Sequence, residues 1–486
     1  MTAMAPARDS DAGSGALRAD ATAARLDVDL ALGRYTLALP RDARQRLATG
    51  WLALGIASLA ASGILAVLLV ASRTPGVARL FPVASFFQAA LVAHVDLSVL
   101  VWFVAFAGAL WSLNSTPRLL PVGWIALAAA AAGAATMAVA PFAAGTPIMA
   151  NYVPVIESGV FLSGLAVFGT GLALVVARGL FASPLVGIRL DGAGALRFGL
   201  NGAIVATAVA LIALAWSFAA LPGGLDGKAY YELLFWGAGH VVQFAWTLLM
   251  LVSWLLLADA IGARVPLSSR VAALLFGIGL ACVFATPVVY LAWDVTSVEH
   301  HRLQTWLMRF GGGLAIAPVA IAVTWALVRA RRGARSDAAR PLAAALASSI
   351  ALFGIGGVIG FAIHGSDVRI PAHYHACIVG VTIAMMGVVY WVLPRLGFAA
   401  PSPRLATWQP YLYGGGQLLH IVGLVWSGGY GVQRKVADGT VVERSLEQVA
   451  GMGLMGLGGL IAVIGGMLFV VIVALAVLRR PRALRR

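Results

Sequence analysis

Apolar residues in this chain form long blocks separated by short polar stretches, without the spacing of an amphipathic helix or the alternation of a half-buried strand. A helix that crosses a bilayer needs about 20 apolar residues. Twelve blocks reach that length, at approximately 48–72, 84–113, 119–141, 152–177, 198–221, 231–259, 271–293, 305–328, 341–363, 374–397, 406–429 and 448–478. The pattern predicts an all-α polytopic membrane protein of about twelve transmembrane helices.

Composition supports this interpretation. Hydrophobic residues make up 61% of the 486 residues and charged residues 11%, whereas soluble proteins carry about 25% charged residues. A soluble enzyme, a disulfide-rich secreted scaffold and a disordered protein are therefore excluded. The two cysteines, Cys282 and Cys377, lie inside apolar segments and form neither a disulfide framework nor a paired metal motif.

We expect one membrane domain at 48–478, flanked by a polar N-terminal tail at 1–47 and a basic C-terminal tail at 479–486. The first tail lacks the apolar core and cleavage site of a signal peptide. Of the 34 Lys and Arg residues, 25 lie in the tails and the loops on their side of the membrane. The positive-inside rule then places both termini in the cytoplasm of a bacterial-type cytoplasmic membrane. Basic residues placed in this way orient the chain in the lipid bilayer and do not indicate nucleic-acid binding.

Histidines concentrate toward the predicted outer half of the membrane. Ionisable residues are costly there and indicate function, and several imidazoles at one depth favour heme or metal ligation. Each histidine alone is also compatible with an interhelical hydrogen bond. Seven of the eight histidines belong to this group: His94, His240, His300, His301, His364, His373 and His375.

His373 and His375 form the sharpest pattern. Residues two apart on a helix point about 200° apart, so one helix could hold two hemes, one on each side. The alternative is a pair of histidines in a helix-start loop that bond backbone carbonyls.

Three motifs together resemble subunit I of the heme-copper oxidase superfamily. The string Arg369-Ile-Pro-Ala-His373-Tyr-His375, followed by Val389-Tyr-Trp-Val-Leu-Pro394, resembles helix 10 of that family. The stretch around His94 is similar to its low-spin heme helix, and Leu234-Phe-Trp236-Gly-Ala-Gly-His240 to the helix with the first copper ligand. The resemblance covers roughly residues 48 to 478.

The resemblance implies two hemes, one low-spin and one high-spin, and one non-heme metal, copper or iron. His94 and His375 would be the axial ligands of the low-spin heme, and His373 the proximal ligand of the high-spin heme. His240 would bind the non-heme metal. Arg369, with His364 and Asp367, would contact heme propionates; the alternative is a solvated loop.

The first departure from the family lies in the sixth predicted helix. Oxygen reductases of the family usually carry a tyrosine four residues after the histidine, but this chain has Gln243 followed by Phe244. Phenylalanine cannot supply the proton and electron that split the O–O bond. Tyr290 on the seventh helix is a candidate substitute, and Gln243 is a further candidate catalytic residue. Nitric oxide reductases need no such tyrosine.

The second departure concerns the remaining metal ligands. The family places a His-His pair at the outer end of the seventh helix, whereas His300 and His301 come about ten residues later, in a predicted loop. Either this pair reaches the metal, or Tyr290, Asp294 or Glu299 replaces it, or the site holds no metal. A carboxylate ligand would favour a harder metal than copper(I).

Few acids lie within the predicted helices, and the fifth and eighth contain none. Chains of acids mark proton paths, and none leads from the inner side. Glu157, expected in the outer half of the fourth helix, suits proton uptake from outside or an interhelical hydrogen bond. The pattern favours a non-pumping nitric oxide reductase.

The leading hypothesis is a catalytic subunit that reduces NO to N2O, and the alternative is a terminal oxidase subunit I that reduces O2 to water. A diheme electron carrier without the metal site is a second alternative, and a transporter is a third. The chain has no CxxCH heme-attachment motif and no soluble copper domain. Electrons must therefore come from a subunit II-like or cytochrome partner, or from a quinol.

Overall fold

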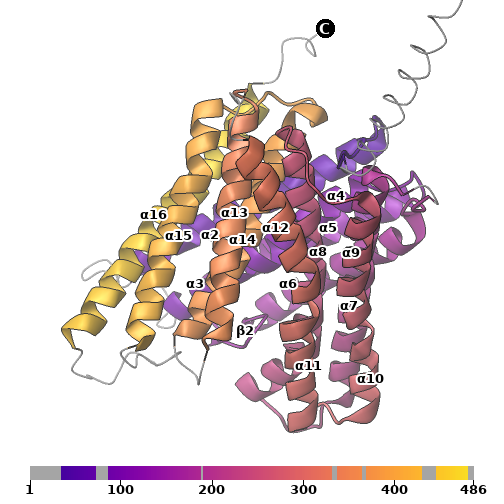
Figure 1. Cartoon of the computed structure of the whole chain (residues 1–486). Helices are drawn as coiled ribbons and strands as arrows, with labels where there is room; N and C mark the ends of the chain where they lie inside the picture. Colours follow the sequence, from indigo (N-terminus) through magenta and orange to yellow (C-terminus); the bar gives the residue numbers. More distant parts are fainter. Residues whose placement is uncertain are drawn as a thin grey trace, which may run out of the picture.

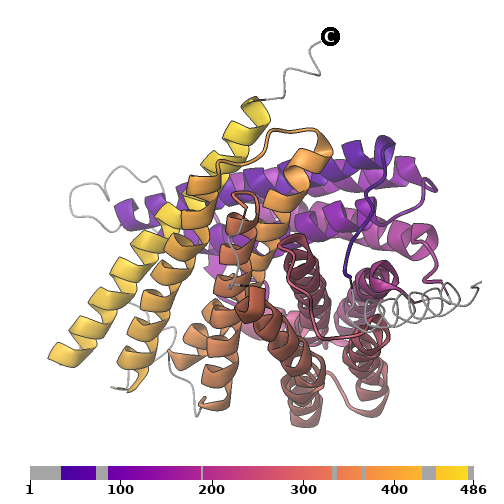
Figure 2. The same ribbon diagram turned by 45° about the horizontal axis from the view of Figure 1, so that its top comes forward.

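Long helices lie side by side in one bundle in a computed structural model of the chain (Figure 1 and Figure 2). The structure describes residues 34–72, 86–187, 190–330, 336–363, 368–429 and 445–479. Within them, eleven helices are long and apolar enough to cross a membrane. The predicted segment 406–429 corresponds to α15 (Pro403–Gly429), which has 27 residues but a more polar sequence. The prediction of an all-α membrane bundle is confirmed.

The helical elements of the described residues are α2 (Ala43–Ser72), α3 (Phe86–Val95), the π-helical turn η2 (Asp96–Val101), α4 (Trp102–Leu113), α5 (Leu120–Val139), the 3₁₀ turn η3 (Ala140–Phe142), α6 (Gly159–Ala182), α7 (Gly192–Ala220), α8 (Gly227–Ala260), α9 (Ser269–Val283), α10 (Ala285–Ala292), α11 (Val298–Gly311), α12 (Gly313–Ala330), α13 (Ala339–Phe361), α14 (Arg369–Val392), the 3₁₀ turn η4 (Leu393–Leu396), α15 and α16 (Leu446–Leu478). The main antiparallel neighbours are α5 with α6, α7 with α8, α13 with α14, and α15 with α16.

The fourth predicted helix begins later than expected. Strands β1 (Thr146–Ile148) and β2 (Val155–Glu157) pair antiparallel, with Ile148 opposite Val155. A proline at position 154 disfavours helix at this point, and α6 starts only after Ser158, whose side chain accepts a hydrogen bond from the Phe161 backbone N–H. The prediction of a helix from residue 152 was therefore wrong at its start, and a hairpin takes its place.

The eighth predicted helix begins earlier than expected. Asp294 accepts hydrogen bonds from the Thr296 backbone N–H at 2.8 Å and hydroxyl at 2.6 Å. Ser297 then caps α11 by accepting a hydrogen bond from the His300 N–H, as serine does at helix starts. His300 and His301 therefore lie in the first turn of a helix, and their predicted place in a loop was wrong.

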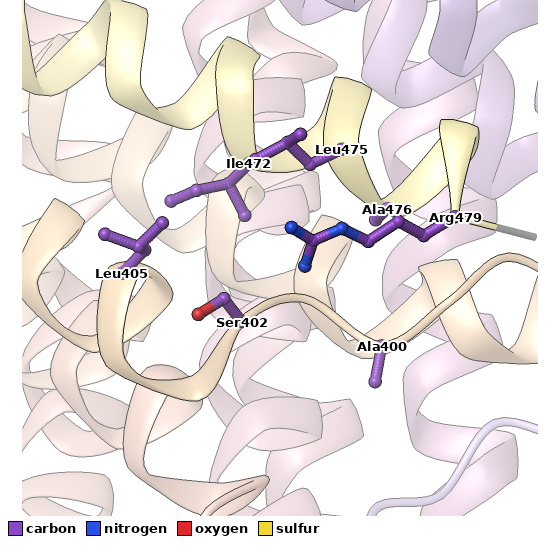
Figure 3. A pocket seen from close by; sticks show the side chains of 7 residues that line it. All are labelled: Ala400, Ser402, Leu405, Ile472, Leu475, Ala476 and Arg479. Atoms are coloured by element: carbon purple, nitrogen blue, oxygen red, sulfur yellow. The ribbon is translucent and has the colours of Figure 1, made fainter.

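Both ends of the described chain lie at one face of the bundle. The Tyr35 hydroxyl donates to the Leu267 carbonyl at 2.8 Å, beside the start of α9. The Ala399 backbone N–H donates to the Ala476 carbonyl near the end of α16. A small pocket opens at the same end of the molecule, between the start of α15 and the end of α16, where Ser402, Leu405 and Arg479 line it (Figure 3). That this face is cytoplasmic stays a prediction.

Candidate functional site

Three imidazoles from distant parts of the chain meet near the start of α14. We call His94 on α3, His375 on α14 and His420 on α15 the His375 cluster. The ring centroids of His375 and His420 are 4.9 Å apart, and His94 lies close enough to His375 for the two imidazoles to interact electrostatically. No sequence motif pointed to His420, which lies nine residues before the end of α15 at Gly429.

Backbone carbonyls hold two of these rings in place. Nδ1 of His94 lies 2.9 Å from the Ser62 carbonyl, and Nδ1 of His420 lies 2.9 Å from the Met455 carbonyl. An imidazole that donates its Nδ1–H to a carbonyl keeps its Nε2 lone pair for a metal. His94 and His420 therefore have the hydrogen bonding that is typical of heme and metal ligands.

Close helix packing places His420. A Cβ atom on Gly458 of α16 would lie 2.2 Å from the His420 backbone nitrogen, so only glycine fits there. Small residues allow membrane helices to approach closely in this way. The contact fixes α15 against α16 and directs His420 toward α14.

His373 takes a different direction from His375. Its Nδ1 lies 2.7 Å from the Gly356 carbonyl on α13, and its ring packs on Gly360 of the same helix. The two histidines of α14 therefore contact different neighbouring helices, α13 and α15.

A buried acid lies two residues beyond His94. Asp96 opens the π-helical turn η2 and is 1% exposed. Neither of its carboxylate oxygens has a hydrogen-bond partner among the described residues. π-Helical turns are frequent at functional sites, and an acid buried at this depth is a functional candidate.

A second group of side chains surrounds Trp236 of α8. We call His240, His300, His301, Tyr152 and Tyr290, with Trp236, the Trp236 cluster. The Trp236 ring centroid lies 4.7 Å from that of His240 and 5.0 Å from that of His301. The indole thus contacts both imidazoles.

His240 has partners from three elements. Its Nδ1 lies 2.8 Å from the Trp236 carbonyl, one turn earlier in α8. The Tyr152 hydroxyl lies 2.9 Å from the ring nitrogens, and the Thr305 hydroxyl of α11 lies 3.3 Å from Nε2. Sequence reasoning missed Tyr152, because the apolar pattern placed it at the start of a helix.

His300 and Tyr290 lie side by side in this cluster. His300 is 1% exposed. Its imidazole interacts with the Trp293 backbone, but neither ring nitrogen lies within hydrogen-bond distance and angle of a partner among the described residues. Its ring centroid is 4.6 Å from that of Tyr290. The Tyr290 hydroxyl pairs with Ser217 of α7 at 2.8 Å. Asp294 and Glu299, the carboxylates considered as replacement ligands, are exposed.

Other predicted site residues lie around these clusters. Gln243 donates to the Gly239 carbonyl of its own helix at 3.2 Å, and Phe244 is buried against Gly311 of α11. Arg369 opens α14 and packs against Gly428 of α15. His364 and Asp367 lie outside the described residues.

Glu157 requires a correction. It lies on strand β2, before α6 begins, and is exposed, close to the Tyr231 hydroxyl of α8. Its expected position inside the outer half of the fourth helix was therefore wrong, because the β1–β2 hairpin replaces the first turns of that helix.

Comparison with known proteins agrees with this arrangement. The family model for cytochrome c and quinol oxidase polypeptide I matches residues 46–468. The chain belongs to this family. It is therefore a heme-copper oxidase subunit I, an integral membrane protein of a class of oxidoreductases.

Individual relatives are more distant. An uncharacterised protein of Rickettsia prowazekii (strain Madrid E) is 29% identical over 88% of this chain and 95% of its own length. An uncharacterised protein of Aquifex aeolicus (strain VF5) is 29% identical over 74% of this chain and 88% of its own length. The fold matches a heme-copper terminal oxidase dimer solved by cryo-electron microscopy, with a TM-score of 0.66 and 16% identity over 90% of this chain and 85% of that one.

The oxidase family uses hemes and a metal at a binuclear site, and the described residues fit these groups unequally. The carbonyl-anchored imidazoles of His94 and His373 suit heme iron. The imidazoles of the Trp236 cluster are the right donors for a non-heme metal. However, no three His, Cys, Asp or Glu side chains converge on a metal position within the described ranges. The Trp236 indole packs against both His240 and His301.

Proposed function

We propose that this subunit reduces nitric oxide to nitrous oxide in the membrane. The reaction consumes two NO molecules, two electrons and two protons and yields N2O and one water. The observation that carries the proposal is Phe244, the residue four positions after His240, which is buried against Gly311. The position where oxygen reductases usually hold a tyrosine is apolar here, and NO reduction does not need that tyrosine.

The proposal gives each histidine a role. His94 and His375 would hold the low-spin heme, and His373 the high-spin heme. His240 would bind the non-heme metal with His300 and His301. When bound, the hemes and the non-heme metal would supply the redox chemistry that transfers electrons to the gas. Arg369, which opens α14 beside Gly428 of α15, would pair with heme propionates.

The chain's own acids are consistent with proton supply from the hairpin side of the bundle. Glu157 is exposed there and lies close to Tyr231. Asp96 is the one fully buried acid of the described residues, and it lies next to His94. Electrons would come from a subunit II-like or cytochrome partner or from a quinol.

Reduction of O2 to water is the second candidate, and two tyrosines favour it. The Tyr152 hydroxyl touches His240, and the Tyr290 ring touches His300. Either phenol could take the role of the tyrosine that oxygen reductases usually carry at the position of Phe244. A diheme electron carrier is the third candidate, because the metal donors do not converge in the described conformation.

The test is gas consumption by the purified, fully reduced complex, with NO and O2 offered separately from one electron donor. We expect rapid NO loss, one N2O per two NO, and little O2 uptake. Rapid four-electron uptake of O2 would overturn the proposal in favour of the oxidase. A purified complex that contains hemes but consumes neither NO nor O2 would identify the protein as an electron carrier.

A further inference from the structure

The Tyr152 hydroxyl contacts His240 across 88 residues of sequence. The two ring centroids are 4.9 Å apart, and the Tyr152 ring also meets Trp236 edge-on at 6.0 Å. The phenol is therefore held on two sides by α8, and its hydroxyl has an imidazole as its partner.

The backbone at Tyr152 adopts an uncommon conformation. Its φ of 68° lies in the left-handed region, which bulky residues rarely adopt and which costs about 1–3 kcal/mol. Tyr152 lies in the loop that joins β1 to β2, and the pairing of Ile148 with Val155 closes this loop. The hairpin thus holds the side chain toward α8 in spite of the cost.

Gly239 makes room for this ring. A Cβ atom at that position would lie 2.1 Å from Cγ of Tyr152, so any other residue would displace the phenol. The hydrogen bond, the left-handed residue and the glycine are independent features, and all three place one hydroxyl beside one imidazole.

The hydrogen-bonding pattern of His240 gives that hydroxyl a function. With the Nδ1 proton donated to the Trp236 carbonyl, Nε2 keeps its lone pair, and the Tyr152 O–H lies 2.9 Å from it. The hydroxyl lies equally close, at 2.9 Å, to Nδ1, and the Thr305 hydroxyl lies 3.3 Å from Nε2. The imidazole therefore has hydroxyl groups beside both of its ring nitrogens. Tyr290 has a different arrangement, because its hydroxyl pairs with Ser217 and its ring lies against Gly237.

We propose that Tyr152, carried by the β1–β2 hairpin, is a positioning residue of the gas-reducing site, whose hydroxyl orients the His240 imidazole and supplies a polar group beside it. This inference rests on the assignment of His240 to that site. It does not depend on whether the gas is NO or O2.

Two measurements on the purified complex test the proposal, and neither requires turnover. The first is the retention of the non-heme metal during titration with a chelator, followed by metal analysis. The second is the vibrational spectrum of carbon monoxide bound to the reduced complex, which reports polar groups near the gas. We expect Tyr152→Phe to lower metal affinity about tenfold or more, as loss of a partner of a ligand does, and to shift the carbon monoxide band.

Matched variants separate the hydroxyl from the ring. Gly239→Ala keeps the hydroxyl but displaces the phenol, and it should reproduce Tyr152→Phe in both measurements. Gly237→Ala displaces Tyr290 in the same way and should leave the carbon monoxide band in place. Tyr411→Phe removes an exposed tyrosine of α15 and should leave both measurements unchanged.

Wild-type metal retention and an unshifted band in Tyr152→Phe would overturn the proposal. A further variant, Tyr152→Leu, removes the ring as well as the hydroxyl. An effect seen in Tyr152→Leu and not in Tyr152→Phe would assign Tyr152 to packing alone. A band that shifts in Gly237→Ala and not in Gly239→Ala would assign the role to Tyr290. The proposed NO activity fails separately, in the gas-consumption assay, because carbon monoxide binding does not depend on which gas the enzyme reduces.

Discussion

The His375 cluster and the Trp236 cluster are built in different ways. In the first, every imidazole lies within a long helix, and backbone carbonyls of neighbouring helices hold His94 and His420. In the second, only His240 and Trp236 lie deep in a long helix. Tyr152 comes from a hairpin, and His300 and His301 come from the first turn of α11. Side chains within long helices have depths that sequence position defines, whereas side chains on turns have positions that only capping and packing define.

The largest expected effect concerns the His375 cluster. His375→Ala or His94→Ala should remove the low-spin heme and nearly all turnover, because a six-coordinate heme needs both axial ligands. Optical spectra and heme quantification of the purified complex would measure this. His420→Ala is the matched control and should keep the low-spin heme. If His420→Ala lost that heme and His375→Ala kept it, the ligand pair would be His94 and His420.

The next effect concerns the Trp236 cluster. His300→Ala should lose more of the non-heme metal than His301→Ala, since His300 is buried with both ring nitrogens free of ordinary hydrogen bonds and His301 is partly exposed. Metal analysis of the two variants, with heme content as the folding control, gives the comparison. Equal metal content in both variants and the wild type would remove this pair from the metal site.

A smaller effect should follow from crowding α15 against α16. Gly458→Ala puts a methyl group against the His420 backbone, and overpacking of this kind costs about 1–3 kcal/mol. We expect a lower thermal unfolding temperature in detergent and partial loss of heme. Gly453→Ala on the same helix meets open space and should unfold at or slightly above the wild-type temperature. Identical temperatures for both variants would contradict the close contact.

The smallest effect concerns the turn that precedes α11. The pKa of the Asp294 carboxyl is lowered by hydrogen bonds from Thr296, whose hydroxyl contributes more than its backbone N–H. A lowered pKa means that the ionised group stabilises the fold above the ordinary aspartate pKa of about 3.9, and that this contribution disappears as the pH falls through the lowered value. Asp294→Asn should therefore be slightly less stable than wild type at pH 6, and the difference should close toward acid. Thermal unfolding of both proteins across this pH range would measure the difference. A stability difference that does not change with pH would exclude the Asp294 charge as its cause.

Sequence alone identified the membrane bundle and the family, because long apolar blocks report helices directly. The motifs around His94 and His240 lie within such blocks, and the motif around His373 leads directly into one. It also defined the order of the helices along the chain and the separate directions of His373 and His375, which follow from the geometry of a single helix.

The tertiary structure decided what no local pattern contains. It brought His420 to His375, buried His300 beside Tyr290, moved Glu157 out of a helix and placed the Tyr152 hydroxyl on His240. The physical reason is range: helical periodicity acts over a few residues, while these contacts join elements far apart in the chain. Proline, serine capping and missing Cβ atoms fix where such elements begin and how closely they approach, and those details became visible only when the helices were packed together.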